Sequence, residues 1–168
     1  MFGGEELQLD YCKLYPCLDL PYTLSRKWKE EGVWKPIAEH DFPAFLDLLR
    51  HAMAVVPPWV RVNRVQRDFP EAREANQHLG FVSDNIRSNL QQMVMEALKK
   101  NGQGCYDVRS REIKNQFPSD TDARARLFVR SYRANHGTEL FISVELPTKG
   151  AIHQVLWSSS NKEPTCLI

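Results

Sequence analysis

Residues 41–65 read DFPAFLDLLRHAMAVVPPWVRVNRV, and this stretch decides the fold class. Apolar side chains at helical spacing predict a helix over 41–56, with Asp41 as its N-cap and Pro43 in its first turn. Two prolines then end the helix, and the β-branched residues of 59–65 predict a strand. A helix, a turn and a strand in close succession are typical of an α/β barrel or sheet.

On the N-terminal side, the pattern predicts one short strand and one short helix. Residues 7–22 mix apolar and polar side chains with two prolines, which favours a short strand followed by a loop. Residues 24–34 predict a helix that Ser25 caps and Gly32 ends.

On the C-terminal side, a second helix is predicted over 83–101, capped by Ser83 or Asp84 and ended by Gly102. Its apolar stripe and that of the 41–56 helix need a partner, and we expect both to pack on the strand at 59–65.

The last third of the chain changes character near residues 115–122. Two strands at 127–132 and 138–146 flank a good hairpin turn at 134–137, and a further strand is predicted at 152–157. The fold class predicted from these elements is mixed α/β.

Length and charge set bounds on function. The chain has 168 residues, which fits one ordinary domain or the pieces of two small ones. Its 22 basic and 21 acidic side chains give a net charge of +1, which excludes a histone-like polycation. No apolar run is long enough to span a membrane, and the first residues do not resemble a signal peptide. Four cysteines without a CxxC pair indicate a reducing compartment, with most of them expected to be small buried hydrophobes.

Arginines are the most informative side chains, and they form two clusters with two possible roles. The clusters are Arg61, Arg64 and Arg67, then Arg109 and Arg111. They either bind the phosphates of a nucleic acid or form salt bridges with nearby acids such as Asp107 and Glu112. On extended backbone, the first three do not all share one face, whereas the last two do.

Known catalytic patterns are absent from the sequence. The histidines are scattered, and no glycine-rich phosphate loop or nucleophile elbow is present. The residues by themselves therefore indicate an α/β chain with basic clusters and no complete catalytic constellation.

Several longer motifs resemble the catalytic subunit of the Elongator complex. Residues 56–70, VPPWVRVNRVQRDFP, are closely similar to a signature of that family, and residues 13–16 resemble its KLYP motif. Residues 105–113, CYDVRSREI, resemble its CRDVRTREV segment, and residues 131–145 are similar to the start of its acetyltransferase part. The order of the motifs also agrees, and the resemblance covers roughly residues 7–155.

This resemblance implies a fold and an activity. The family joins a radical S-adenosylmethionine (radical SAM) α/β barrel to a GNAT acetyltransferase domain, and it modifies the wobble uridine (U34) of tRNA. Residues 1–70 would be the C-terminal part of the barrel, 71–120 a helical linker and 121–168 the first strands of the GNAT sheet. The family's cofactors are a 4Fe-4S cluster, S-adenosylmethionine and acetyl-CoA, and it transfers an acetyl or carboxymethyl group.

The chain departs from the family at both cofactor sites. No group of three closely spaced cysteines precedes Lys13, and no glycine-containing pyrophosphate turn follows Ile152. Only Cys105 remains of the linker zinc motif. We therefore expect this chain to bind none of these cofactors and to be inactive by itself.

Site residues and partners follow from the same resemblance. Lys13 and Tyr15 would lie at the mouth of the barrel as catalytic residues, and the five arginines named above would contact the tRNA backbone. The implied partners are tRNA, other Elongator subunits and a second copy in a homodimer, in the cytoplasm and also the nucleus. The alternative is a non-catalytic fragment that binds tRNA or a partner, whose incomplete GNAT sheet would leave open edges and exposed apolar surface.

Overall fold

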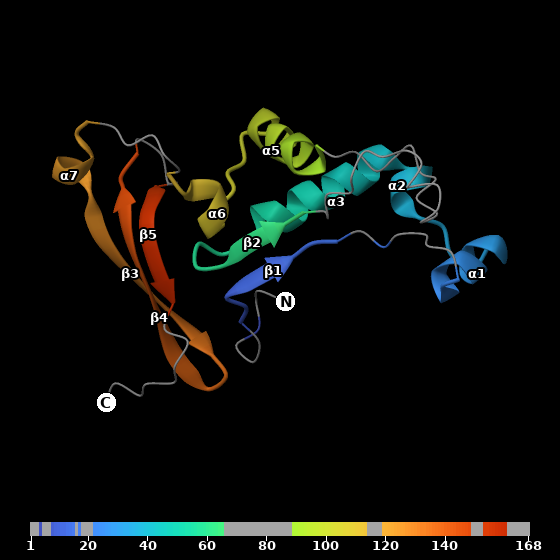
Figure 1. Cartoon of the computed structure of the whole chain (residues 1–168), viewed down its shortest axis with the longest axis horizontal. Helices are drawn as coiled ribbons and strands as arrows, with labels where there is room; N and C mark the ends of the chain where they lie inside the picture. Colours follow the sequence, from blue (N-terminus) through green and yellow to red (C-terminus); the bar gives the residue numbers. More distant parts are fainter. Residues whose placement is uncertain are drawn as a thin grey trace. The chain divides into compact units, whose positions relative to one another are not determined.

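The computed structural model describes residues 4, 8–15, 17, 22–65, 89–113, 119–148 and 153–160. These residues form a mixed α/β structure, as predicted (Figure 1). The elements in chain order are β1 (Tyr11–Lys13), α1 (Leu24–Glu30), α2 (Ile37–His40), α3 (Phe42–Ala54), β2 (Arg61–Arg64), α5 (Leu90–Lys100), α6 (Val108–Arg111), α7 (Thr121–Arg124), β3 (Arg126–Ala134), β4 (Gly137–Leu146) and β5 (Gln154–Ser160).

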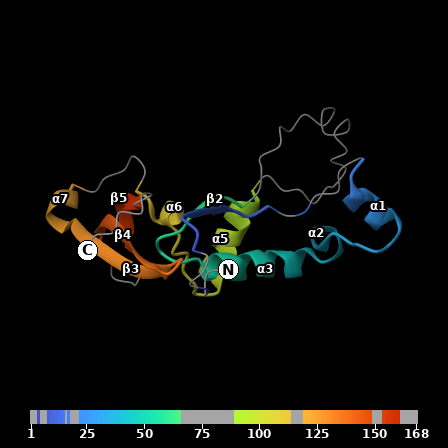
Figure 2. The ribbon, with the colours of Figure 1, turned by 90° about the horizontal axis from the view of Figure 1, so that it is seen from below.

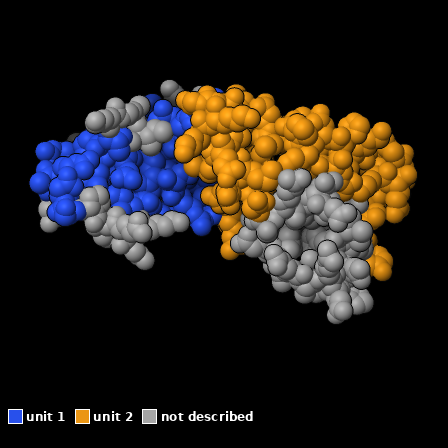
Figure 3. All heavy atoms as spheres, turned by 90° about the horizontal axis from the view of Figure 1, so that it is seen from above, with its two compact units in different colours: residues 1–12, 53–63, 103–168 blue, residues 13–52, 64–102 orange. Residues whose placement is uncertain are grey.

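The chain divides into two compact units (Figure 3). The first unit contains residues 1–12, 53–63 and 103–168, and the second contains residues 13–52 and 64–102. The domain limits proposed from the family resemblance, at residues 70 and 120, remain a prediction.

Strands β1 and β2 form a two-stranded sheet. The Arg61 amide donates to the Asp10 carbonyl at 2.9 Å, and the Leu14 amide donates to the Arg64 carbonyl at 2.8 Å. Because both bonds advance in the same direction along the two segments, the strands are parallel. Val60, Val62 and Val65 are almost completely buried, so the strand predicted at 59–65 is confirmed in a shorter form.

Helix α3 is the helix predicted over 41–56, and it is shorter by a few residues. The Asp41 carboxylate accepts a hydrogen bond from the Ala44 amide at 3.0 Å, so the predicted cap is confirmed. The predicted apolar stripe is buried at Phe45, Leu49 and Met53. Leu48 lies outside that stripe and is 56% exposed.

The other two predicted helices are also present, α1 (Leu24–Glu30) with the predicted first residue but a different cap and α5 (Leu90–Lys100) with a later first residue. Thr23, not Ser25, caps α1, because the Thr23 hydroxyl accepts from the Arg26 amide. Helix α5 begins at Leu90, and its Leu90, Val94 and Leu98 are buried; the caps predicted at residues 83 and 84 lie outside the described residues. Gly32 and Gly102 follow α1 and α5 with positive φ, so the predicted helix ends are confirmed.

Strands β3, β4 and β5 form an antiparallel meander in that order, the predicted hairpin with its additional strand (Figures 1 and 2). Asn135 and His136 make the turn. One face buries Phe141, Ser143 and Glu145. The other face exposes Leu127 by 66%, Val129 by 55%, Leu140 by 40% and Ile142 by 36%. The exposed apolar surface expected of this sheet is thus present in the structure.

Helix α6 was not predicted, and a buried carboxylate starts it. Asp107 accepts from the Arg109 and Ser110 amides at 3.1 and 3.2 Å, which caps the helix. The oxygen that accepts from the Arg109 amide, Oδ2, also accepts from the Val62 amide at 3.2 Å, which ties the start of α6 to β2. An aspartate ahead of VRSR is a typical N-cap pattern, so the signal for this helix was present in the sequence.

A second buried carboxylate, Glu145 on β4, joins the meander to α6. It is fully buried and accepts from Arg130 at 2.7 and 2.8 Å, from Arg111 at 3.0 Å and from the Ser143 hydroxyl at 2.7 Å. Burial by itself would raise the pKa of Glu145, but the bonds from Arg130, Ser143 and Arg111 outweigh it and lower that pKa. We call these four side chains the Glu145 cluster.

Two adjacent leucines of α3 differ in burial, with Leu49 buried and Leu48 exposed, so they form a variant and its control. We expect Leu49→Ala to lower the free energy of unfolding by about 2–5 kcal/mol, because it leaves a cavity. Leu48→Ala on the exposed side should change it by about 0.5 kcal/mol or less. Urea unfolding followed by circular dichroism measures both, and equal effects would show that α3 is not packed by its Leu49 face.

The Glu145 cluster predicts a large, pH-dependent effect. Glu145→Gln should lower the free energy of unfolding by about 3–5 kcal/mol, because it leaves the buried Arg111 guanidinium without a charge partner. Since the folded pKa of Glu145 is lowered, its contribution is present above the unfolded carboxyl pKa of about 4.3 and is lost as the pH falls through the folded value. The difference between wild type and variant should therefore shrink in acid.

Asp120→Asn serves as the control for this charge change, because Asp120 pairs with Arg124 at 3.1 Å on the exposed surface. It should cost about 1 kcal/mol or less. Unfolding midpoints measured at several pH values decide the matter, and a pH-independent difference at Glu145 would contradict the charged cluster.

Candidate functional site

Arg61 takes the salt-bridge role that the sequence left open. Its guanidinium forms a two-point ion pair with the Glu112 carboxylate, with the second bond at 3.2 Å. Its Nε also donates to the Asn63 side chain at 3.2 Å. The side chain is 39% exposed, but much of its donor capacity is already used within the first unit.

Arg111 lies inside the protein. Its side chain is 2% exposed and donates to Glu145, to the Tyr106 carbonyl at 2.7 Å and to the Pro58 carbonyl at 2.6 Å. The prediction that Arg109 and Arg111 share a face was wrong. The segment is helical rather than extended, and residues two apart point to different sides of a helix.

Arg109 is the exposed arginine of α6. Its guanidinium donates to the Asn63 carbonyl, and this bond holds the side chain against β2. An arginine has five N–H donors, so one bond to a carbonyl leaves most of them for another acceptor.

Arg64 is exposed at the end of β2. In the described part of the chain its side chain makes no hydrogen bond or ion pair, so it presents an uncompensated positive charge. Arg67 lies outside the described residues.

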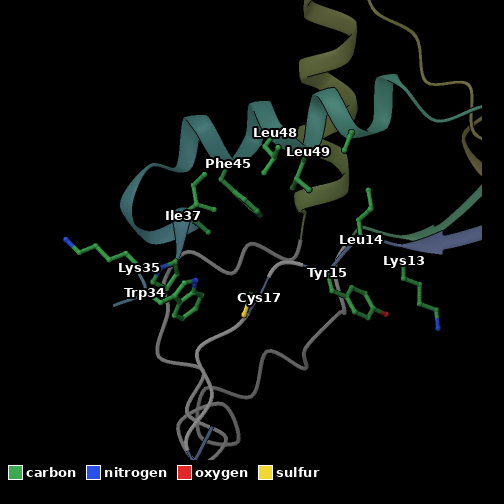
Figure 4. Close-up of a pocket in the computed structure, with 13 residues that line it drawn as sticks. Lys13, Leu14, Tyr15, Cys17, Trp34, Lys35, Ile37, Phe45, Leu48 and Leu49 are labelled. Carbon is green, nitrogen blue, oxygen red and sulfur yellow. The ribbon is translucent and has the colours of Figure 1, made fainter. Parts of the chain in front are cut away.

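Lys13 and Tyr15 border a cavity of about 500 Å³ in the second unit (Figure 4). One wall is the segment after β1, and a second is the connector that carries Trp34 and Lys35. The floor is the buried face of α3, where Phe45 and Leu49 are 4% and 8% exposed. The structure thus brings the two residues predicted to be catalytic to one apolar pocket.

Polar groups are few around this pocket. Among the described lining side chains they are the Tyr15 hydroxyl, the Trp34 indole N–H, the Cys17 thiol and two lysine ammonium groups, and none of these residues is an aspartate or glutamate. In Figure 4 the Cys17 sulfur lies between the rings of Trp34 and Tyr15 in the view, and Lys13 and Lys35 extend outward on opposite sides.

Cys105, the residue left of the family's zinc motif, is buried and 3.1 Å from an Asp107 oxygen. Burial, with the Asp107 charge, raises the pKa of the Cys105 thiol to about 11, so it stays protonated at neutral pH. A metal ligand must be a thiolate. The described residues contain no group of three histidine, cysteine or acidic side chains that could hold a metal ion.

No helix in the described ranges is long and apolar enough to cross a membrane.

Comparisons with known proteins agree on one family. The chain is 31% identical over 152 residues to a tRNA uridine(34) acetyltransferase of Methanocaldococcus jannaschii, which covers 86% of this chain and 26% of that protein. It is 36% identical over 150 residues to Elongator complex protein 3 of Homo sapiens, which covers 87% of this chain and 25% of that protein. No family model matches.

A solved structure agrees with these relatives. The archaeal Methanocaldococcus infernus Elp3 with an N-terminal deletion matches with a TM-score of 0.66 and 29% identity, over 86% of this chain and 32% of that one. The chain spans about a quarter of the length of the curated relatives it matches. With the motifs in their expected order and a similar fold, the chain belongs, as a partial-length member, to the family of Elongator complex protein 3 and the tRNA uridine(34) acetyltransferases.

Proposed function

We propose that this chain is the tRNA-contacting part of an enzyme that transfers an acetyl or carboxymethyl group to the wobble uridine of tRNA. The observation that carries the proposal is similarity along most of the chain to proteins named tRNA uridine(34) acetyltransferase. Because the chain matches only about a quarter of those proteins, it supplies one part of the activity.

The exposed arginines support a contact with the tRNA backbone. Arg64 has no partner in the described part of the chain, and Arg109 uses one of its donors. Guanidinium groups bind phosphate oxygens with two parallel hydrogen bonds, and such contacts carry no base identity. Arg61 and Arg111, proposed from the sequence for the same role, are held by Glu112 and Glu145, so we assign them to positioning their segments.

The two sheets suggest how the chain fits the family's architecture. The parallel pair β1–β2 would be the end of the radical SAM barrel, and the antiparallel meander β3–β5 would be the first strands of the GNAT sheet. Lys13 closes β1, so it and Tyr15 would lie at a strand's C-terminal end, where barrel enzymes carry their chemistry. We propose that these two residues face the reacting uridine.

The residues present do not fit the family's iron–sulfur cofactor. A 4Fe-4S cluster needs cysteine thiolates close together, whereas Cys105 is protonated and buried and Cys12 is half-buried with a pKa that burial and the Asp107 charge raise. The cysteines of this chain are therefore not assigned as ligands of an iron–sulfur cluster. S-adenosylmethionine and acetyl-CoA would be bound by other parts of a complete enzyme.

A second function is favoured by the exposed face of the meander. A non-catalytic fragment that binds tRNA or another Elongator subunit would retain the arginines and use the apolar face formed by Leu127, Val129, Leu140 and Ile142. The two functions differ in whether the chain supports group transfer, and they share the tRNA contact.

The tRNA contact predicts a change in salt dependence. Arg64→Ala and Arg109→Ala should each weaken binding to all tRNAs alike and lower the slope of log affinity against log salt by about one unit. Fluorescence anisotropy across a salt series measures this slope. Arg124→Ala is the control, because Asp120 already neutralises Arg124. Identical slopes for wild type and both variants would refute the phosphate contacts.

The cysteine arrangement predicts that the isolated chain assembles no cluster. After anaerobic reconstitution with iron and sulfide, the wild type should show the same visible absorbance as a variant with all four cysteines replaced by serine. A cluster present in the wild type alone would refute this prediction. Addition of tRNA and acetyl-CoA should release no free CoA, because no pyrophosphate turn follows the last predicted strand.

A further inference from the structure

Strand β3 forms one edge of the meander along its whole length. The order of the described strands puts β4 on one side of β3 and no strand on the other (Figure 1). All nine residues of β3 pair with β4 in one continuous register, and the strand contains no proline. A long edge strand without a proline or a bulge is a template on which a further strand can form.

The opposite edge of the meander is already used within the chain. The Ile113 amide donates to the Val155 carbonyl of β5 at 2.9 Å, and Glu112 forms a parallel bridge with Val155. Among the described strands of this sheet, β3 therefore provides the edge at which pairing can continue. We call it the free edge of β3.

The hairpin turn determines which backbone groups point to this edge. Asn135 and His136 both have positive φ, as in a two-residue turn whose first flanking carbonyl accepts from the second flanking amide. Ala134 and Gly137 are therefore a hydrogen-bonded pair, and such pairs alternate along two antiparallel strands. By this alternation, the residues of β3 that direct their N–H and C=O groups away from β4 are Leu127, Val129, Ser131 and Arg133.

The same four residues share one face of the strand, and their side chains are exposed. Leu127 and Val129 are 66% and 55% exposed, which is high for apolar side chains. The free edge thus combines outward backbone groups with apolar surface beside them.

Each end of β3 carries an exposed guanidinium group that is bonded to neutral acceptors. Arg126 donates to two backbone carbonyls at 2.9 and 2.8 Å. Arg133 donates to the Thr138 hydroxyl and to a carbonyl of the turn, both at 3.2 Å. Neutral acceptors leave the positive charges in place, so a carboxylate beside either guanidinium would gain a charge-assisted hydrogen bond.

We propose that the free edge of β3 binds an extended protein segment that is acidic at both ends and apolar between them. The segment lies antiparallel to β3, with its carboxylates beside Arg126 and Arg133 and its apolar side chains on Leu127 and Val129. In such strand addition, main-chain hydrogen bonds give the affinity and alternate side chains select the partner. The proposal rests on the apolar face of the second function above, and it does not depend on the tRNA contact.

Charge disfavours a second copy of β3 as the occupant. Two β3 strands paired antiparallel over residues 126–133 would put Arg126 of one copy opposite Arg133 of the other, and like charges directly opposite are destabilising. A nucleic acid would use the two guanidinium groups, but Leu127 and Val129 between them offer nothing to a phosphate backbone. An extended acidic and apolar segment uses both.

The probe is an eight-residue peptide, Glu-Thr-Val-Thr-Val-Thr-Val-Glu, amidated at its C-terminus and labelled with fluorescein through a glycine at its N-terminus. In antiparallel pairing its two glutamates lie opposite Arg133 and Arg126, and its three valines lie opposite Ser131, Val129 and Leu127. The amides of those valines then face β3, whereas the amides of the threonines face away.

Three control peptides separate the contributions of charge and of backbone pairing. One has lysine at both ends, one carries N-methyl groups on its valines, and one carries N-methyl groups on its threonines. Fluorescence anisotropy measures binding to the full chain. We expect the lysine peptide to bind at least tenfold more weakly than the probe, the valine-methylated peptide not to bind, and the threonine-methylated peptide to bind like the probe.

A pair of charge variants tests the acidic ends. The double variant Arg126→Glu, Arg133→Glu should weaken binding of the probe by about tenfold and make the lysine peptide the better ligand. The double variant Lys99→Glu, Lys100→Glu makes the same reversal of charge on exposed residues of α5 and should leave binding of the probe unchanged.

A pair of backbone variants tests the edge itself. Val129→Pro removes an outward amide without removing a bond to β4, so it should abolish binding. Val129→Thr keeps the amide and the shape of the side chain, so it should retain most of the binding. Circular dichroism checks that both variants fold, and the methylated peptides test the same edge from the ligand side if Val129→Pro does not.

Several results would overturn the proposal. Equal binding of the two methylated peptides would show that the probe docks by its side chains alone, which leaves only the apolar face of the second function. Equal binding of the probe and the lysine peptide, or equal losses in the two charge variants, would refute an acidic partner. If no peptide binds, the proposal fails, while the salt slopes of Arg64→Ala and Arg109→Ala still decide the tRNA contact.

Two further results would assign the edge to another occupant. If a single-stranded RNA octamer binds in place of the probe and the double arginine variant loses it, β3 contacts RNA. If the chain dimerises with rising concentration and Val129→Pro abolishes the dimer, the edge belongs to a second copy.

Discussion

The first unit depends on one buried carboxylate. Glu145 is buried together with the Arg111 guanidinium and the Ser143 hydroxyl and also binds the partly exposed Arg130, and the guanidinium of Arg111 continues to the carbonyls of Tyr106 and Pro58. The turn before β2, the start of α6 and the middle of the meander therefore converge on a single acid. Desolvation of such charges is costly, and it is offset only when each donor and acceptor finds its partner in the right place. The cluster thus favours one arrangement of these three segments over other compact ones, because any shift would leave a charge buried alone.

Asp107 complements this cluster at the other end of α6. It caps the helix and accepts from the Val62 amide, while Arg111 anchors the end of the helix. With both ends fixed, the rotation of this short helix about its axis is fixed too, and Arg109 is the arginine left facing solvent. The buried charges of Asp107, Arg111 and Glu145 therefore determine that the Arg109 guanidinium is the one exposed to a ligand. This link connects the packing of the unit with its proposed contact to tRNA phosphates.

Repeating patterns in the sequence predicted much of the fold, whereas single contacts between distant residues escaped prediction. The apolar period of Phe45, Leu49 and Met53 located α3, and alternation around Asn135 and His136 located the hairpin. The opposite roles of Arg109 and Arg111 could not be read from the local sequence, because Glu145 lies far along the chain from Arg111. The pocket was missed for the same reason, since Tyr15, Trp34 and Phe45 come from three separate segments. Lys13 and Tyr15 were singled out through the family motif, and the structure adds the apolar wall that they border.

The hairpin turn has a consequence for misfolding. Asn135 and His136 both have positive φ, and His136 adopts this conformation at a cost of about 1 kcal/mol or more, because its side chain disfavours the left-handed region. A two-residue turn with both residues in this region nevertheless matches the twist of the strands, so it favours the register in which Ala134 pairs with Gly137. A slip of one residue would exchange the faces of a strand and put Val144 or Leu146 where the Arg111 guanidinium needs a carboxylate. Charge inside the sheet thus acts as a register check, which rejects shifted hairpins that a purely apolar interior would tolerate.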